Sequence, residues 1–166
     1  MKEWENFVKK INKDAKELQI AIVGKYTGLE DAYLSVIESL KIACVHENRK
    51  LNIAWIEAEN LENKNSETWK MLKKSAGILV PGGFGKRGTE GKILAAKYAR
   101  ENKIPYLGLC LGMQLMTIEF ARHFLKNPQI TSEEFDEEGK TNPKNYVIHF
   151  LPGQHKDNEK GGTLRL

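Results

Sequence analysis

The chain has 166 residues, of which 40% are hydrophobic and 29% charged, a composition typical of a soluble domain with one core. It has no apolar run of the roughly 18 to 20 residues that a membrane span requires, and its first residues lack a signal-peptide core. The net charge of +4 comes from dispersed lysines without a basic stripe interleaved with aromatic residues. We therefore expect a cytoplasmic location, with neither a membrane nor a nucleic-acid partner.

Strand-like and helix-like segments alternate along most of the chain. Short apolar runs rich in β-branched residues predict strands at 19–24, 52–56, 77–80 and 104–109. Apolar residues at three- and four-residue spacing, with helix-forming composition, predict helices at 31–44, 67–74, 89–102 and 111–124. This order predicts an α/β fold, with an open, mainly parallel sheet and helices on both faces. Ligands of such sheets bind beyond the carboxyl ends of the strands.

The two ends of the chain depart from this alternation. Residues 4–18 form an amphipathic, lysine-rich segment, which we expect to be a linker helix from an upstream domain. The acidic stretch at 127–145 predicts a solvated loop, and residues 146–150 predict one further strand. We therefore expect a linker over residues 1–17 and a single domain over residues 18–166.

A G-x-C-x-G pattern at residues 108–112 lies between a predicted strand and a predicted helix. A nucleophile on such a tight turn needs a strained backbone, and its neighbours two residues away must be small, as Gly108 and Gly112 are. At the N-terminus of a helix, unpaired N–H groups favour the thiolate of Cys110 over the thiol. The alternative is that Cys110 is a small core residue at the end of a buried strand.

The cysteine content limits the disulfides and metal sites that we expect. Two cysteines, Cys44 and Cys110, make a disulfide framework improbable. Cys44 and His46 point to different faces of a helix, and no second pair of ligands completes a metal site. We expect no metal in this domain.

A second glycine-rich turn, at residues 81–85, follows the strand at 77–80 and should lie at the same sheet edge as Cys110. Attack on a carbonyl needs two N–H donors aimed at the developing oxyanion, and the N–H groups of Gly83 and Leu111 fit that role. The alternatives are a plain tight turn and a phosphate-binding loop. The hydroxyl residue of a Walker loop is absent after Gly85-Lys86, and the glycine spacing does not match a dinucleotide fingerprint.

Six segments together, in this order, resemble the glutamine amidotransferase domain of the CTP synthases, a class I glutaminase with a flavodoxin-like fold. They are Gly24-Lys25-Tyr26, the run from Asp31 to Glu38, Val80-Pro81-Gly82-Gly83-Phe84-Gly85, the run from Gly108 to Gln114, Glu134-Phe135 and the run from Gly161 to Leu166. The resemblance extends over nearly the whole chain from about residue 18.

The resemblance implies that Cys110 attacks the side-chain amide of L-glutamine, releases ammonia and leaves a glutamyl thioester that water hydrolyses. It implies that Glu134 pairs with the α-ammonium of glutamine and Arg165 with its α-carboxylate. The glutamine-binding residues that it implies are Gly83, Phe84, Leu111, Gly112, Met113, Gln114, Glu134 and Arg165.

The resemblance also implies partners outside this domain. Ammonia would pass to the synthase domain of a full-length chain, which aminates UTP to CTP with ATP and Mg²⁺, with GTP as an allosteric activator. Full-length members of the family form tetramers. No cofactor is expected in the glutaminase domain itself.

One part of the family pattern is missing. In the family, the catalytic histidine and its glutamate partner occur in a His-Pro-Glu motif beyond the Gly-Gly-Thr-Leu-Arg-Leu segment, and this sequence holds no such motif. None of the four histidines, His46, His123, His149 and His155, stands in that context. We expect the C-terminal part of the domain to be missing and this chain alone to be inactive or slow. The alternatives are a cysteine hydrolase of the α/β-hydrolase or dienelactone-hydrolase type, and a catalytically silent regulatory domain.

Overall fold

The computed structural model describes residues 1–11, 14–25, 30–136 and 138–151. Its central element is a four-stranded sheet in the order β2-β1-β3-β4, in which every neighbouring pair is parallel. The strands are β1 (Lys16–Gly24), β2 (Arg49–Glu57), β3 (Gly77–Val80) and β4 (Tyr106–Gly108). The predicted parallel α/β sheet is confirmed, although β4 is shorter than the predicted strand.

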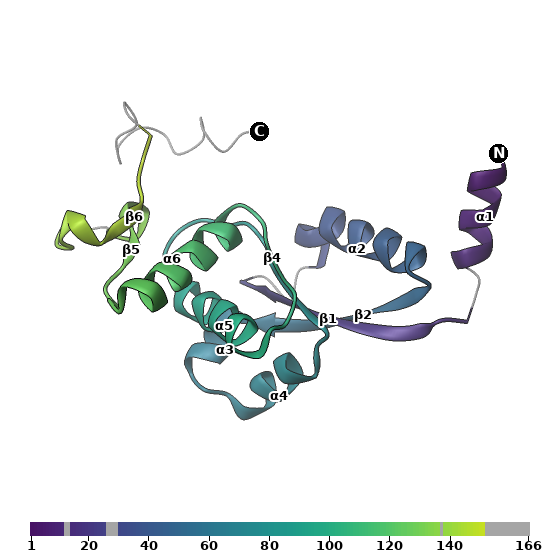
Figure 1. Ribbon diagram of the computed structural model, residues 1–166, viewed down its shortest axis with the longest axis horizontal. Helices are drawn as coiled ribbons and strands as arrows, with labels where there is room; N and C mark the ends of the chain where they lie inside the picture. The colour runs from purple at the N-terminus through teal and green to yellow at the C-terminus, as the bar shows by residue number, and fades with distance from the viewer. Residues whose placement is uncertain (12–13, 26–29, 137, 152–166) are drawn as a thin grey trace.

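Helices cover both faces of this sheet (Figure 1). A 3₁₀ turn, η1 (Glu30–Tyr33), leads into α2 (Leu34–His46) on one face. On the other face lie α3 (Ala58–Glu62), α4 (Ser66–Lys74) and α5 (Thr89–Asn102). The side chain of Asn65 caps α4, because its Oδ1 accepts from the N–H groups of Glu67 and Thr68 at 3.0 and 3.1 Å. The short α3 is not predicted from the sequence.

The side-chain alternation of β1 explains why helices are needed on both faces. Ala21 and Val23 point into one core cluster, whereas Ile22 points to the opposite face, and all three are fully buried. The cluster that contains Ala21 joins the sheet to α3, α4 and α5 through Ala54, Ile56, Ala58, Leu61, Leu72, Ile78, Val80, Ala95 and Ala99. Burial of this apolar area is the main stabilising contribution to the sheet.

A second core cluster forms around α6 (Leu111–Leu125), which follows β4. It joins this helix to α5 and to a small parallel sheet of β5 (Thr131–Ser132) and β6 (Tyr146–Ile148). Between these strands lie two 3₁₀ turns, η2 (Glu133–Phe135) and η3 (Pro143–Asn145). The prediction of a solvated loop over residues 127–145 is therefore wrong, because Ile130 and Phe135 are buried in this cluster.

The N-terminal part also differs in detail from the prediction. Helix α1 (Lys2–Ile11) is present, and the Nζ of Lys10 donates to the backbone carbonyl of His46 in α2 at 3.0 Å. Strand β1 already begins at Lys16, so the expected linker over residues 1–17 reaches into the sheet. The first residue of α2, Leu34, is exposed, and the buried residue beside it, Tyr33, ends the preceding turn η1.

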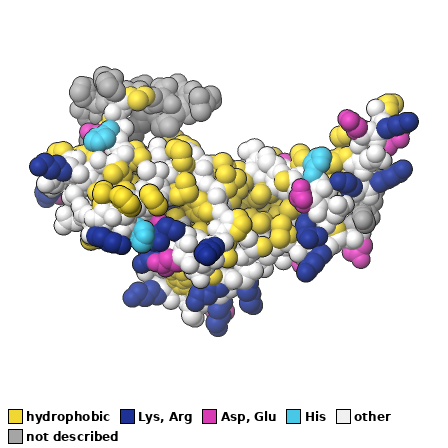
Figure 2. Space-filling view, viewed as in Figure 1, with side chains coloured by type: hydrophobic (Ala, Val, Ile, Leu, Met, Phe, Trp, Pro, Cys, Tyr) yellow, Lys and Arg dark blue, Asp and Glu magenta, His cyan; other side chains and the backbone are white. Residues whose placement is uncertain are grey.

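Apolar side chains gather on the visible face of the molecule over the region of β4 and α6 (Figure 2). Leu107 of β4 is 53% exposed, and Met113, Met116, Phe120 and Phe124 of α6 are also exposed. We call these five residues the apolar face. No helix in the described ranges is long and apolar enough to cross a membrane.

Candidate active site

The turn between β4 and α6 holds Cys110 in a strained conformation. Its φ of 50° and ψ of −111° lie in a region that non-glycine residues rarely adopt. Its side chain is exposed, whereas the chain's other cysteine, Cys44, is buried. The predicted strained strand-to-helix turn is confirmed, and the alternative of a buried core thiol is wrong for Cys110.

The glycines of the G-x-C-x-G pattern make this turn possible. A Cβ atom on Gly112 would lie 2.0 Å from the carbonyl oxygen of Val80, at the end of β3. A Cβ atom on Gly108 would lie 2.5 Å from the backbone of Gly112. Because any larger side chain would push α6 away from the sheet, the two glycines fix the height of Cys110 above the strand ends.

Two backbone N–H groups lie near this turn. Leu111 is the first residue of α6, so its N–H has no partner within the helix, while the carbonyl of Cys110 accepts from Met113 and Gln114. In the second glycine-rich turn, a Cβ on Gly82 would lie 3.3 Å from the Cβ of Cys110. Gly83 comes next, and within the described ranges its N–H makes no hydrogen bond. The predicted meeting of the two turns at one sheet edge is confirmed.

The predicted glutamine-binding residues are partly brought together. The side chains of Phe84 and Met113 are exposed near the two turns, and Gln114 is half-buried in the first turn of α6. Glu134, on η2, reaches the second turn, where its Oε1 accepts from the N–H of Gly85 at 3.1 Å. Arg165 lies outside the described residues.

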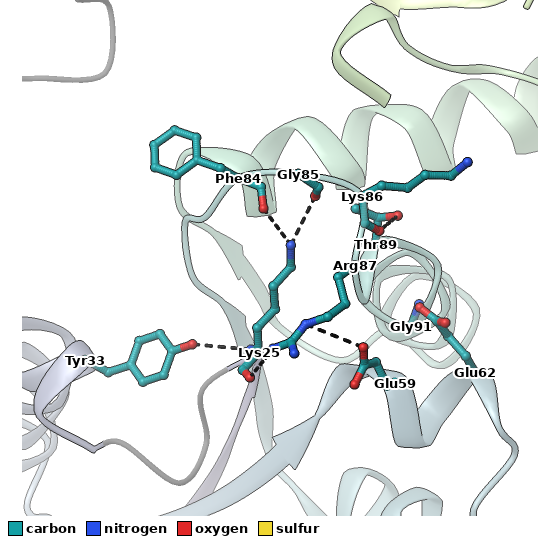
Figure 3. Close-up of polar contacts among 10 residues, drawn as sticks. All are labelled: Lys25, Tyr33, Glu59, Glu62, Phe84, Gly85, Lys86, Arg87, Thr89 and Gly91. Atoms are coloured by element: carbon teal, nitrogen blue, oxygen red, sulfur yellow. Dashed lines mark hydrogen bonds and ion pairs between the residues drawn. The ribbon is translucent and has the colours of Figure 1, made fainter. Parts of the chain in front are cut away.

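Sequence reasoning missed a polar network that holds the second turn, drawn in Figure 3. Lys25 follows the last residue of β1, and its Nζ donates to the carbonyls of Phe84 and Gly85 at 2.7 and 3.0 Å. Arg87 donates to the carbonyl of Lys25 at 3.1 Å and forms an ion pair with Glu59 at 3.5 Å. In the sequence, Lys25 stands directly after a strand-ending glycine and within the Gly24-Lys25-Tyr26 segment of the family resemblance, but neither signal predicts its hydrogen bonds.

Two buried ammonium groups flank the second turn, and their environments shift their titration. Burial and the nearby Arg87 lower the pKa of Lys25, against the opposing effect of Glu134 and Glu59. Burial, helped by the charge of Lys25, lowers the pKa of Lys92 from 10.5 to about 8. Lys92 lies on the inner face of α5 and is 1% exposed, with its Nζ 3.9 Å from the Cβ position of Gly83.

The described histidines lie on other elements than the two turns. His46 ends α2, where its ring packs 5.3 Å from that of Phe7, and His123 is in α6. His149 follows β6, and its Nδ1 lies 3.6 Å from the Oε2 of Glu133. His155 falls outside the described residues. Within the described part of the chain, no three His, Cys, Asp or Glu side chains are grouped as metal ligands.

A separate open depression of about 950 Å³ lies at the N-terminal end of α5. Its wall carries both charges, from Lys86, Arg87 and Arg122 and from Glu59 and Glu90, and Arg122 already pairs with Glu90 at 2.7 Å. Neither Cys110 nor Gly83 is part of this wall. The chemistry is therefore assigned to the strand ends and not to this depression.

Comparison with known proteins agrees with this geometry. The family model of class-I glutamine amidotransferases matches residues 29–158, which include both turns and Glu134. The chain belongs to this family. A solved structure of the Trypanosoma brucei CTPS glutaminase domain with bound acivicin matches this amidotransferase chain with a TM-score of 0.72 and 38% identity. The match covers 84% of this chain and 52% of that one.

Curated relatives of this class-I amidotransferase chain are CTP synthases. The chain is 51% identical over 163 residues to the protein of Mycoplasma mycoides and 50% identical over 166 residues to that of Caldanaerobacter subterraneus. It is 47% identical over 171 aligned residues to CTP synthase 2 of Saccharomyces cerevisiae. These matches cover 98 to 100% of this chain but only 29 or 30% of each relative. The chain thus spans about three-tenths of the length of these relatives.

Proposed function

We propose that this chain is the glutaminase part of a CTP synthase, with Cys110 as its nucleophile. The observation that carries the proposal is the strained, exposed Cys110 beside Gly82, with the N–H groups of Gly83 and Leu111 on the same sheet edge. Membership of the class-I amidotransferases favours this function over an ester hydrolase of the α/β-hydrolase or dienelactone-hydrolase type.

The proposed reaction proceeds in two steps. The Cys110 thiolate attacks the side-chain amide carbon of glutamine, and the N–H groups of Gly83 and Leu111 stabilise the oxyanion that forms. The C–N bond then breaks, the nitrogen takes up a proton and leaves as ammonia, and a glutamyl thioester remains. Water adds to the thioester carbon, the C–S bond breaks, and glutamate leaves with the free thiol regenerated. The sum is glutamine and water to glutamate and ammonia.

We propose that glutamine is bound by residues around the Cys110 turn and the second glycine-rich turn. We propose that Glu134 binds the α-ammonium and Arg165 the α-carboxylate, both through charge-assisted hydrogen bonds. One oxygen of Glu134 already holds the Gly85 N–H, so its second oxygen is the one available to the ligand. Phe84, Gly112, Met113 and Gln114 complete the proposed site.

None of the residues named above is proposed as the general base of the reaction. The family's His-Pro-Glu motif does not occur in the 166 residues. The histidine that takes the proton is therefore proposed to come from such a motif in a longer polypeptide, and this chain alone should turn glutamine over slowly.

The full-length relatives suggest the wider role. We propose that ammonia made at Cys110 passes to a separate synthase domain, which uses ATP and Mg²⁺ to aminate UTP to CTP, with GTP as activator, in a cytoplasmic tetramer. The chain's match to 29% of a CTP synthase's length supports the existence of that second domain. No residue of this chain is assigned to those nucleotides.

Calorimetry tests the proposed substrate. L-Glutamine should bind the chain, L-asparagine, one methylene shorter, should bind at least about tenfold more weakly, and Cys110→Ala should retain glutamine binding. Absence of glutamine binding, together with turnover of simple esters, would favour the hydrolase. Glutamine binding without hydrolysis by a full-length protein would favour a silent regulatory domain.

A further inference from the structure

One peptide group in the second turn is held from both sides. The Nζ of Lys25 donates to the carbonyls of Phe84 and Gly85, at 2.7 and 3.0 Å. From the other side, the N–H of Gly85 donates to Glu134 at 3.1 Å. Lys25 follows the last residue of β1 and Glu134 lies on η2, so side chains from two distant segments hold the same short stretch of loop. Figure 3 shows the two hydrogen bonds of Lys25.

The lysine is itself firmly anchored. Its side chain is 7% exposed, its N–H donates to the hydroxyl of Tyr33 at 3.3 Å, and its carbonyl accepts from Arg87 at 3.1 Å. Arg87 is in turn paired with Glu59 on α3. The backbone of Lys25 is therefore held in place. Moving its ammonium away from the two carbonyls would leave a buried charge without these acceptors.

The loop needs such an anchor. Three of the residues from Pro81 to Gly85 are glycines, and Gly85 has a φ of 73°. Glycine backbones have many accessible conformations, whereas an oxyanion donor must be held within a fraction of an ångström of its productive position.

We propose that Lys25 is a positioning residue for the oxyanion hole. Its ammonium holds the Phe84 and Gly85 carbonyls, so that the neighbouring Gly83 N–H stays directed at the oxyanion formed on attack by Cys110. This role rests on the proposed glutaminase function. Lys25 itself does not touch the reacting atoms, so its effect should appear only in reactions that develop an oxyanion.

The test compares two electrophiles on the 166-residue chain. In the chloromethyl ketone analogue of glutamine, a CH₂Cl group replaces the amide nitrogen. The thiolate first adds to the ketone carbon, which places a negative charge on the oxygen. The sulfur then displaces chloride from the adjacent CH₂ group, and its bond to the former carbonyl carbon breaks as the C=O bond reforms, which leaves a thioether. Iodoacetamide alkylates the same thiol by direct loss of iodide, with no oxyanion. Intact-mass spectrometry gives both rates.

We expect Lys25→Met to slow labelling by the chloromethyl ketone about tenfold or more, the order of effect of disturbing one oxyanion donor. The rate with iodoacetamide should stay within about twofold, because the thiol remains exposed. Lys25→Arg should recover part of the rate, since a guanidinium can donate to both carbonyls. Lys92→Met is the matched control. It removes a neighbouring buried ammonium, whereas the side-chain hydrogen bonds to the Phe84 and Gly85 carbonyls come from Lys25, and it should change the ketone rate by less than about threefold.

Hydrogen exchange of the 81–88 segment gives a readout that does not depend on glutamine chemistry. Exchange there should rise at least about tenfold in Lys25→Met and stay near wild type in Lys92→Met. Unchanged exchange and unchanged ketone labelling in Lys25→Met would overturn the proposal, as would equal slowing with both electrophiles. If the wild-type chain is not labelled by the ketone at all, the proposed function fails, and the exchange data alone decide whether Lys25 holds the loop.

Discussion

Lys92→Met should stabilise the protein at neutral pH. Lys92 carries an ammonium that is 1% exposed, and burial lowers its pKa from 10.5 to about 8, with a further lowering from the charge of Lys25. At about 1.4 kcal/mol for each pH unit between these two pKa values, keeping the charge in the folded state costs about 3 kcal/mol at pH 7. Methionine has a similar length, is a good helix former and carries no charge.

The stability gained by Lys92→Met should decrease as the pH rises. Because the folded-state pKa of Lys92 is lower than the unfolded one, the unfolded chain binds more protons between pH 8 and 10.5. The free-energy cost of the Lys92 charge in the folded state is therefore greatest below pH 8 and disappears above pH 10.5. The gain in the free energy of unfolding from Lys92→Met should fall from about 3 kcal/mol at pH 7 to about half that value at pH 9.5.

Urea unfolding followed by circular dichroism at the two pH values measures this gain. Lys97→Met is the control on the same helix, because Lys97 is about half exposed, and it should change the free energy of unfolding by less than about 0.5 kcal/mol at either pH. A Lys92→Met protein that is destabilised at pH 7, or whose gain is the same at both pH values, would refute the reasoning.

Three further predictions follow from packing and burial. Gly112→Ala should lower the free energy of unfolding, measured by thermal unfolding, by about 3 kcal/mol, because its Cβ would lie 2.0 Å from a backbone oxygen of β3. Gly85→Ala, with open space around it, should lower it by only about 1 kcal/mol, and similar losses for the two variants would contradict this reasoning. Arg100→Ala should lower the free energy of unfolding, measured in urea, by about 3 kcal/mol, because it leaves the buried Glu119 without the guanidinium that pairs with it at 2.7 Å. Replacing both residues by methionine should recover most of the loss, and no recovery would argue against a charge effect. Phe120→Glu should reduce the fluorescence of bound anilinonaphthalene sulfonate by about half, and an unchanged signal would place dye binding elsewhere than the apolar face.

Much of the fold follows from local patterns. The mainly apolar run Gln19 to Gly24 and its counterparts predict buried parallel strands, because strands covered on both faces of a sheet carry mainly apolar side chains. The glycines around Cys110 predict the strained turn, because the requirement for small neighbours is local in sequence. These features need no knowledge of distant contacts.

The features that the sequence did not predict depend on distant contacts. The acidic stretch after α6 resembles a loop in composition, yet Phe135 is buried because it packs into the cluster formed with α5 and α6. The burial of Lys92 contradicts its polar character and follows from its place on the inner face of α5. The part played by Lys25 was equally hidden, since its acceptors lie about sixty residues later in the chain.

Covalent labelling located by peptide mapping tests the central claim most directly. The chloromethyl ketone analogue of glutamine should label the chain once, at Cys110 and not at the buried Cys44, and saturating L-glutamine should slow the labelling while L-asparagine should not. The Cys110→Ser chain should remain unlabelled. Labelling at another residue, or labelling of Cys110 at a rate that glutamine does not change, would contradict the assignment of Cys110 as the nucleophile of a glutamine site.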